Sequence, residues 1–334
     1  MGVRRRCLLL FFAAIFATAG SRAAGAGDSS EIVDSSRRMT LEGRWDEAVA
    51  ALNAAVARAK HDGDGKRETA LRVELLRVVQ DRSSYNRRDP GTVAEALEAA
   101  QSAARKAGDP KVDADLAQSV GQVRYSEAFS SGDWQTPRGL FLRALEGRKR
   151  AGDRRGESES LFYLGLTYEQ AGEKAPARER YEASLAISEK IQDASLQSFA
   201  HRHLGGLLEE EGRLDAAYEH IARSVALRRE ARFFSLLPFA LIQQADFLAQ
   251  HRGQRAQAIA LLDEAIDVAE DSRSTRALSA ARLSLAKLLS ETGDATGALS
   301  VAQCGLRAAR DFGDREGIAE AEKQVADLER RTSS

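Results

Sequence analysis

The chain has 334 residues, of which 43% are apolar and only 6% aromatic, and its formal net charge is −1. This length suits one extended domain or two or three compact ones, and the abundance of alanine, leucine, arginine and glutamate favours helices over strands. Because basic and acidic residues are interleaved, no strongly basic domain offers a footprint for phosphates, which argues against nucleic-acid binding.

The first 26 residues have the pattern of a secretory signal peptide. Three arginines, Arg4 to Arg6, precede an apolar run from Cys7 to about Ala19, which is short for a membrane-spanning helix. Small residues permit cleavage after Ala19 or after Ala26. We therefore expect an exported protein, periplasmic or secreted; the alternative is a membrane anchor formed by an uncleaved N-terminal segment.

Removal of this segment leaves Cys304 as the single thiol, since Cys7 is the only other cysteine. Neither an intramolecular disulfide nor a cysteine-based zinc site can then form. We interpret Cys304 as a small apolar residue on a packed helix.

From residue 30 to residue 312, glycines recur at intervals of about forty residues. They are Gly43, Gly91, Gly132, Gly172, Gly212, Gly253 and Gly293, and an alanine stands five residues after each of them except at Pro137. A fixed period of this size indicates stacked helix–turn–helix units. We predict about seven repeats, with each glycine in the turn between the two helices of its repeat.

A second small residue stands about seven residues before five of the turn glycines: Ser36, Gly165, Gly205, Ala245 and Ala286. A glycine inside a helix costs roughly 1 kcal/mol relative to alanine. We interpret Gly165 as a packing residue, because a close approach of the paired helix outweighs this cost. The alanine after the turn serves the same contact from the opposite side.

Prolines and Gly-Asp pairs indicate where the helices begin and end. Pro90, Pro110, Pro137, Pro176 and Pro238 are expected in loops or first helical turns, where the missing N–H does no harm. A Gly-Asp pair recurs in KHDGD, RKAGD, KRAGD and RDFGD. There we expect glycine to end one helix and aspartate to cap the next.

The stretches YLGLTYEQAGEKAPARERYEASL (163–185) and HLGGLLEEEGRLDAAYEHIARSV (203–225) combine leucine–glycine, a turn glycine, a packing alanine and a large anchor residue. In these features the chain resembles the tetratricopeptide repeats. Its period exceeds the usual 34 residues and is similar to that of kinesin light chains and of maltose-activator-type regulators. The resemblance covers about residues 30–312 and implies an all-α, right-handed α–α superhelix. It implies no particular function, because a scaffold defines the family.

Residues 313–334 are expected to cap the stack. In DREGIAEAEKQVADLERR, the residues Ile318, Ala321, Val325 and Leu328 form one apolar stripe among charges. Such a helix covers the open face of the last repeat. The chain stops shortly after it, from which we expect no further catalytic domain.

No motif for catalysis or for a cofactor is evident: the sequence has no Walker-type loop, no GxSxG and no HExxH. His201 and His203 stand about 200° apart around a helix, so they cannot share a metal ion. We interpret the run Glu209–Glu211 as solvated surface and the run Arg148–Arg150 as favourable charge at a helix C-terminus. We therefore predict neither an enzyme nor a bound cofactor or metal.

The first helices of the repeats should line the concave side, where residues i, i+3, i+7 and i+10 share one face. This assigns eleven residues to a partner-binding groove: Glu159, Phe162, Leu166, Glu169, Phe199, Arg202, Gly206, Glu209, Phe239, Ile242 and Asp246. The mixture suits a peptide with apolar anchors and some positive charge. The alternative is that Phe199 and Phe239 pack between repeats while the acidic residues are merely solvated.

The stretch REARFFSLLPFALIQQ (229–244) departs most from its neighbours, because Phe233 and Phe234 replace Asp193 and Ala194 of the preceding unit. An exposed apolar cluster often marks a contact with a partner. A thickened core between repeats would have the same sequence, so both interpretations stay open.

These observations predict an exported, non-catalytic scaffold or adaptor that binds a protein or peptide partner in its groove. A carboxylate clamp of the kind found in chaperone-binding relatives is not expected, because such clamps use groove asparagines and the only asparagines are Asn53 and Asn86. The alternative function is a small-ligand or peptide sensor that regulates a separate effector, such as a caspase-like protease. Neither function involves nucleic acid or a membrane span after signal cleavage.

Overall fold

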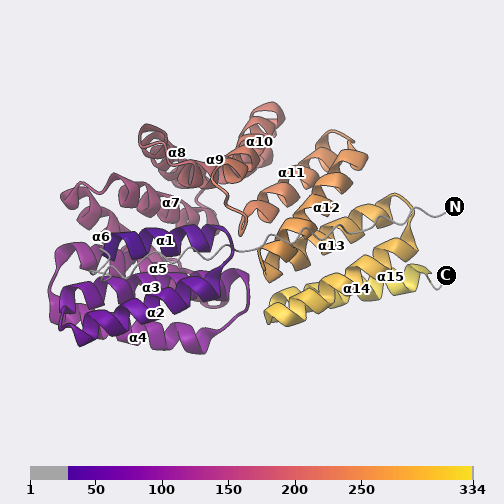
Figure 1. Ribbon diagram of the computed structural model, residues 1–334. Helices are drawn as coiled ribbons and strands as arrows, with labels where there is room; N and C mark the ends of the chain where they lie inside the picture. Colours follow the sequence, from indigo (N-terminus) through magenta and orange to yellow (C-terminus); the bar gives the residue numbers. More distant parts are fainter. Residues whose placement is uncertain (1–28, 333–334) are drawn as a thin grey trace, which may run out of the picture.

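The computed structural model describes residues 29–332, and all of the regular structure in this range is helical (Figure 1). The predicted signal segment therefore lies outside the described residues. Within 29–332, no helix combines the length and the apolar character that a membrane crossing requires.

Fourteen of the described helices form seven consecutive antiparallel pairs, as the forty-residue period predicts. The first helices of the pairs are α1 (Ser29–Leu41), α3 (Gly65–Tyr85), α5 (Pro110–Ser131), α7 (Arg154–Gln170), α9 (Ala194–Glu210), α11 (Leu237–His251) and α13 (Thr275–Glu291). The second helices are α2 (Trp45–His61), α4 (Pro90–Ala107), α6 (Gln135–Ala151), α8 (Lys174–Lys190), α10 (Leu214–Glu230), α12 (Arg255–Asp271) and α14 (Ala295–Phe312). The last helix, α15 (Arg315–Thr332), buries Ala321, Val325 and Leu328 against the final pair.

The turns follow the predicted glycines with one exception. Gly43, Gly132, Gly172, Gly212, Gly253 and Gly293 all adopt positive φ between the helices of a pair. Gly91 was expected in the same place, but it is the second residue of α4. The turn of the second repeat is instead formed by residues 86–89, where Asp89 caps α4 and Pro90 occupies its first position. The second repeat thus begins its second helix with an aspartate cap and a proline and has no glycine in its turn. For this reason the interval from Gly43 to Gly91 is 48 residues and not about forty.

Gly-Asp pairs join successive repeats, as predicted. Gly63, Gly108, Gly152 and Gly313 have positive φ. The carboxylates of the first three following aspartates, Asp64, Asp109 and Asp153, accept backbone hydrogen bonds from the helices that they cap. All five prolines lie within the first three residues of a helix.

The small residues stand at contacts between paired helices, and their predicted role is confirmed. Ala177 and Ala217 are fully buried, and Gly165 and Gly205 are also buried. A Cβ atom at Gly205 would lie 2.8 Å from Cγ1 of Ile221, and one at Gly165 would collide with the ring of Tyr181. At Gly165 and Gly205 the two helices of a pair therefore lie so close together that only a small residue fits between them.

The stack curves until its first repeats contact its last ones (Figure 1). The backbone N–H of Arg88, after α3, donates to the carbonyl of Phe312 at the end of α14 (2.9 Å). The Arg88 side chain also pairs with Asp314 at 3.2 Å. The superhelix is therefore closed, and its concave side is an interior.

Candidate binding site on the inner face

The eleven residues predicted for the groove are all buried or half-buried. Glu159, Phe162 and Phe199 line a central cavity of about 90 Å³. Leu166 belongs to the same apolar cluster as Phe162, and the ring of Phe239 lies edge-on to Tyr85 at 6.1 Å. The remaining members make contacts between repeats: Gly206 lies near Gln243, and Ile242 packs in the cluster between α10 and α13.

The first repeat covers one side of the cavity. Leu41 and Trp45 line it on one side, and Phe233 and Leu236 line it on the other. The backbone N–H of Ser235 donates to the carbonyl of Leu41 at 2.9 Å. The central part of the aromatic departure, residues 231–236, is the connection between α10 and α11. Phe233 and Leu236 of this connection are buried, and it packs against the first repeat, so it belongs to the core.

Further contacts between the ends of the chain support this closure. Nε of Arg232 lies 3.0 Å from Oε1 of Glu42. At Gly43 the backbone passes so close to the carbonyl of Ser272 that no side chain fits between them. The first repeat is therefore held against both the α10–α11 and the α12–α13 connections.

On the α3 side of the cavity, charged groups form a compensated network. Glu74 accepts from Ser36 (3.2 Å) and pairs with Arg77 (2.5 Å) and Arg37 (3.5 Å). Burial opposes ionisation of Glu74, but the two guanidinium groups outweigh it and lower its pKa to about 2. Asp81 is also paired with Arg77 at 2.9 Å, yet burial raises its pKa to about 6.

Arg148 joins this network from the last turn of α6, where the basic run was expected, but its side chain is buried. Its side chain is only 7% exposed and lies 3.2 Å from Asp115 and 3.1 Å from Glu159. It also donates to Gln118 (3.2 Å) and Ser160 (3.0 Å). The predicted position at a helix C-terminus is confirmed, but charge alone did not reveal that α5 and α7 supply acceptors on both sides of α6.

The α9–α10 side of the interior has a different balance of charge. Arg228 is 2% exposed, and its Nη1 donates to the carbonyl of Leu236. Its guanidinium lies 5.6 Å from the ring centre of Phe199 and 5.7 Å from that of Phe233. Within residues 29–332 no carboxylate lies at ion-pair distance from Arg228. Burial and, secondly, the charge of Arg202 lower its pKa to about 9.

Arg202 projects from α9 one turn beyond Phe199 and likewise has no carboxylate within ion-pair distance in the described residues. Burial lowers the pKa of Arg202, although Glu169 opposes this effect. Glu169 itself is engaged by the Tyr181 hydroxyl and by Nδ1 of His203, which lies 3.0 Å away. Arg228, beside Phe199, and Arg202 thus both lack a carboxylate partner within residues 29–332, and neither is among the residues that line the central cavity.

The other two predicted groove acids differ in their surroundings. Glu209 lies 2.8 Å from Nε2 of His251. Burial raises the pKa of Asp246 to about 6, with Lys287 opposing it. The neighbours of Glu209 form ion pairs between repeats, Glu210 with Lys174 and Glu211 with Arg178.

His201 and His203 do face different surroundings, as their spacing predicts. Nδ1 of His201 lies 3.1 Å from Nδ1 of His220 on α10, whereas His203 lies inside against Phe162 and Tyr181. In residues 29–332 no group of three or more His, Cys, Asp or Glu side chains is arranged to hold a metal ion.

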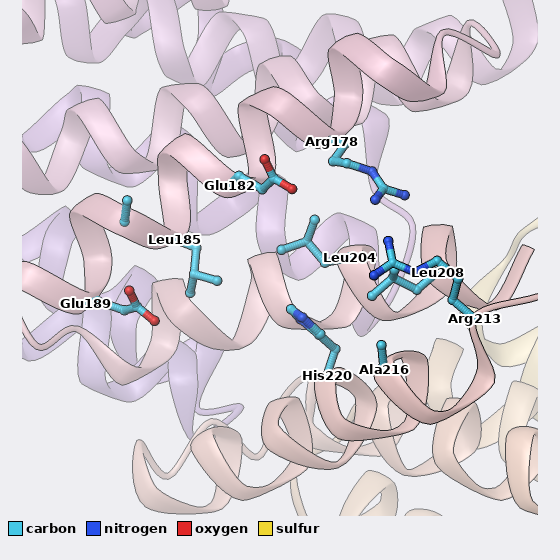
Figure 2. Close-up of a pocket in the computed structure, with 10 residues that line it drawn as sticks. Arg178, Glu182, Leu185, Glu189, Leu204, Leu208, Arg213, Ala216 and His220 are labelled. Atoms are coloured by element: carbon cyan, nitrogen blue, oxygen red, sulfur yellow. The ribbon is translucent and has the colours of Figure 1, made fainter. Parts of the chain in front are cut away.

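A second concavity, of about 270 Å³, lies on the outer side between α8 and α10 (Figure 2). Leu204 and Leu208 of α9 form its apolar floor. Its charged rim comes from the flanking helices and consists of Arg178, Glu182, Glu189, Arg213 and His220. Sequence analysis missed this cleft, because it depends on how far apart two second helices stand.

The comparisons with known proteins agree with this architecture. Residues 128–190 match the model of the tetratricopeptide repeat. The fold is similar to that of a Rap protein crystallised with competence and sporulation factor, with 12% identity, a TM-score of 0.64 and coverage of 90% of this chain and 87% of that one. No curated protein sequence matches the chain.

Two further solved structures have similar folds. Aspartyl phosphate phosphatase F from Bacillus subtilis is 10% identical, with a TM-score of 0.53 over 93% of this chain and 96% of that one. A tetratricopeptide repeat protein from Parabacteroides merdae is 19% identical, with a TM-score of 0.50 over 90% of this chain and all of that one. The predicted resemblance to the tetratricopeptide repeats is thus confirmed by the match over residues 128–190 and by the fold of these solved structures. At these identities the likeness concerns the fold alone.

Proposed function

We propose that this repeat scaffold is exported, is non-catalytic, and binds a protein or peptide partner through its inner face. The observation that carries the proposal is that Phe162, Phe199 and Phe233 line one cavity together with charged side chains, namely Arg37, Arg77, Arg155, Asp81 and Glu159. Apolar anchors beside a few directional polar groups are the usual composition of a recognition site. The Rap protein of similar fold was crystallised with a factor bound, which supports partner binding on such a scaffold.

Binding of a peptide requires the interior to open. A cavity of about 90 Å³ holds only a few water molecules, each of which takes about 30 Å³ in the liquid. The ion pair across the closure contributes little: Arg232 in the pair with Glu42 is 68% exposed, and such pairs contribute about 0–1 kcal/mol. The apolar contact of Leu41 and Trp45 with the α10–α11 segment is therefore the main restraint on opening.

Affinity capture from the protein's own cell envelope tests the proposal. The wild-type chain should retain a defined protein, and Phe199→Ala and Arg202→Glu should each weaken its capture without unfolding the chain. Arg229→Met is the matched control, because Arg229 pairs with Glu264 on the exposed side of α10. Equal capture by all four chains would exclude the inner face as the binding site.

The need for opening has a separate test. In a Cys304→Ser background, Glu42→Cys and Arg232→Cys place two thiols across the closure, and a bis-maleimide cross-link should fix the closed form. Cross-linking should then abolish capture of the partner, whereas the uncross-linked double variant should still capture it. Unchanged capture after complete cross-linking would show that the partner binds elsewhere.

Export is proposed from the basic and apolar pattern of the N-terminal segment. Mass spectrometry of the native protein should find a chain that begins at Gly20 or Gly27. A chain that retains residues 1–19 and sediments with membranes would support the anchored alternative.

The small size of the enclosed cavity favours a second candidate, a sensor of a small ligand that regulates a separate effector. In that case a metabolite of small volume should raise the melting temperature while capture returns no protein. This combination of results would replace the scaffold proposal.

A further inference from the structure

The outer cleft between α8 and α10, of about 270 Å³, is larger than the central cavity of about 90 Å³. Its floor is apolar, because Leu204 and Leu208 of α9 lie buried beneath it and Leu185 and Ala186 of α8 line its side. Since the cleft lies on the outer side, a ligand reaches it without any opening of the closed superhelix.

Two carboxylates on the rim of the outer cleft have no partner in the described chain. Glu182 and Glu189 are both exposed, and within residues 29–332 neither side chain forms an ion pair or a hydrogen bond. They stand seven residues apart on α8, so they lie on the same face of this helix, about 10.5 Å from each other along its axis. Figure 2 shows Leu185 between them.

The basic groups of the same rim are already engaged. Arg178 and Arg213 both form ion pairs with Glu211, the second at 3.9 Å. Nδ1 of His220 lies 3.1 Å from Nδ1 of His201. The charge that the rim leaves without a partner is therefore negative and belongs to α8.

We propose that the outer cleft binds an amphipathic helix of a protein partner, in which two basic residues stand seven positions apart on either side of apolar ones. Basic side chains at this spacing share one face of the ligand helix, so they match Glu182 and Glu189. Apolar residues three and four positions after the first basic one lie on the same face and meet the floor formed by Leu204 and Leu208. Docking of an apolar helix face into a groove is a recurring mode of peptide recognition.

Fluorescence anisotropy of a labelled helical peptide tests the outer cleft. The probe is an alanine-based peptide of about 18 residues, long enough to form a helix, with two lysines seven positions apart and leucines three and four positions after the first lysine. The control peptide has the same composition, but its second lysine stands five positions after the first, about 140° around the helix.

The chain should bind the probe at least about threefold more tightly than the control peptide, and added salt should weaken binding of the probe. Equal affinity for the two peptides, or no binding of the probe, would overturn the proposal.

Variants of α8 decide whether the probe lies in the cleft. Glu182→Gln and Glu189→Gln should each weaken its binding about two- to fivefold. Ala186→Gln places a larger polar side chain over the apolar floor and should weaken binding at least about tenfold. Glu179→Gln and Ala175→Gln are the matched controls, because both residues are exposed on α8 and do not line the cleft. If Ala186→Gln binds the probe as tightly as the wild-type chain does, the proposal is wrong.

This inference goes beyond the proposed function and does not depend on it. Phe199→Ala, and the closed form cross-linked through Glu42→Cys and Arg232→Cys, should bind the probe as the wild-type chain does. Loss of probe binding in the cross-linked form would show that the peptide enters the interior, which would overturn the outer cleft as its site.

Discussion

Arg148 and Arg228 stand at the same place in two repeats, sixteen residues after the turn glycines Gly132 and Gly212, and both side chains are buried. Their surroundings differ. Arg148 contacts two carboxylates, one amide and one hydroxyl group, and these neighbours raise its pKa. Arg228 lies between two aromatic rings with a single carbonyl as acceptor, and its pKa is lowered.

The comparison shows that an arginine at the same position of two repeats can have two different environments. In α6 the arginine ties α5, α6 and α7 together through ion pairs and hydrogen bonds of both of its terminal nitrogens. In α10 the same residue type has a single hydrogen-bond acceptor, the carbonyl of Leu236. A repeat scaffold can thus give one position a structural role in one unit and not in another.

The largest expected effect comes from removing the compensated arginine. Arg148→Met leaves Asp115 and Glu159 without their partner, so we expect a loss of about 3 kcal/mol in the free energy of unfolding, measured by urea denaturation. Arg150→Met, at the exposed end of the same helix, is the control and should change little. A loss below 1 kcal/mol would mean that the network does not stabilise the fold.

A smaller effect is expected from disturbing the close contact between the two helices of a repeat. Gly205→Ala places a Cβ atom 2.8 Å from Cγ1 of Ile221, and such overpacking should cost about 1–3 kcal/mol. The adjacent Gly206→Ala finds only Nε2 of Gln243 at 3.5 Å, so its better helix propensity should stabilise the chain by up to about 1 kcal/mol. Equal urea midpoints for the two variants would contradict the close-packing account.

The uncompensated arginine should respond in the opposite direction from Arg148. In chloride buffer, Arg228→Met removes a buried charge and should leave the free energy of unfolding unchanged or raise it by about 1 kcal/mol. Denaturation of both variants in the same buffer makes the comparison direct. If Arg228→Met destabilises the chain as much as Arg148→Met does, the two sites do not differ as described.

The smallest effect concerns the outer side of the same repeat, where His201 and His220 replace the Leu161 and Arg180 of the preceding unit. Burial, followed by the charge of His220, lowers the pKa of His201 from 6.5 to about 4. The unfolded chain then binds more protons in this interval, so stability is full above pH 6.5 and falls as the pH falls towards 4.

Because the His201 side chain is only half-buried, solvent screening should reduce its contribution at pH 5 to about 1 kcal/mol. His201→Gln should flatten the pH dependence of the melting temperature by this amount, whereas the exposed His61→Gln should not. A wild-type profile that His201→Gln leaves unchanged would show that His201 does not titrate in this interval.

Local chemistry made much of the fold predictable. Gly165 and Gly205 stand out because helices rarely accept glycine without a packing reason, and Asp64 and Asp153 follow glycines at helix ends. Gly91 was misplaced, because a glycine in a first helical turn and one in a loop look the same in a periodic pattern. The inner face was assigned from helix periodicity, and Glu159, Phe162 and Phe199 do line the cavity.

The sequence by itself determined the paired helices, most of their turns and their small contact residues, because these features depend on neighbours within about forty residues. Only the tertiary structure decided that the stack closes, that Phe233 packs against the first repeat, and that Arg148 is compensated while Arg228 is not. These outcomes depend on the summed curvature of seven repeats, which brings Leu41 to Ser235 and Arg88 to Phe312, and no local pattern encodes such a sum.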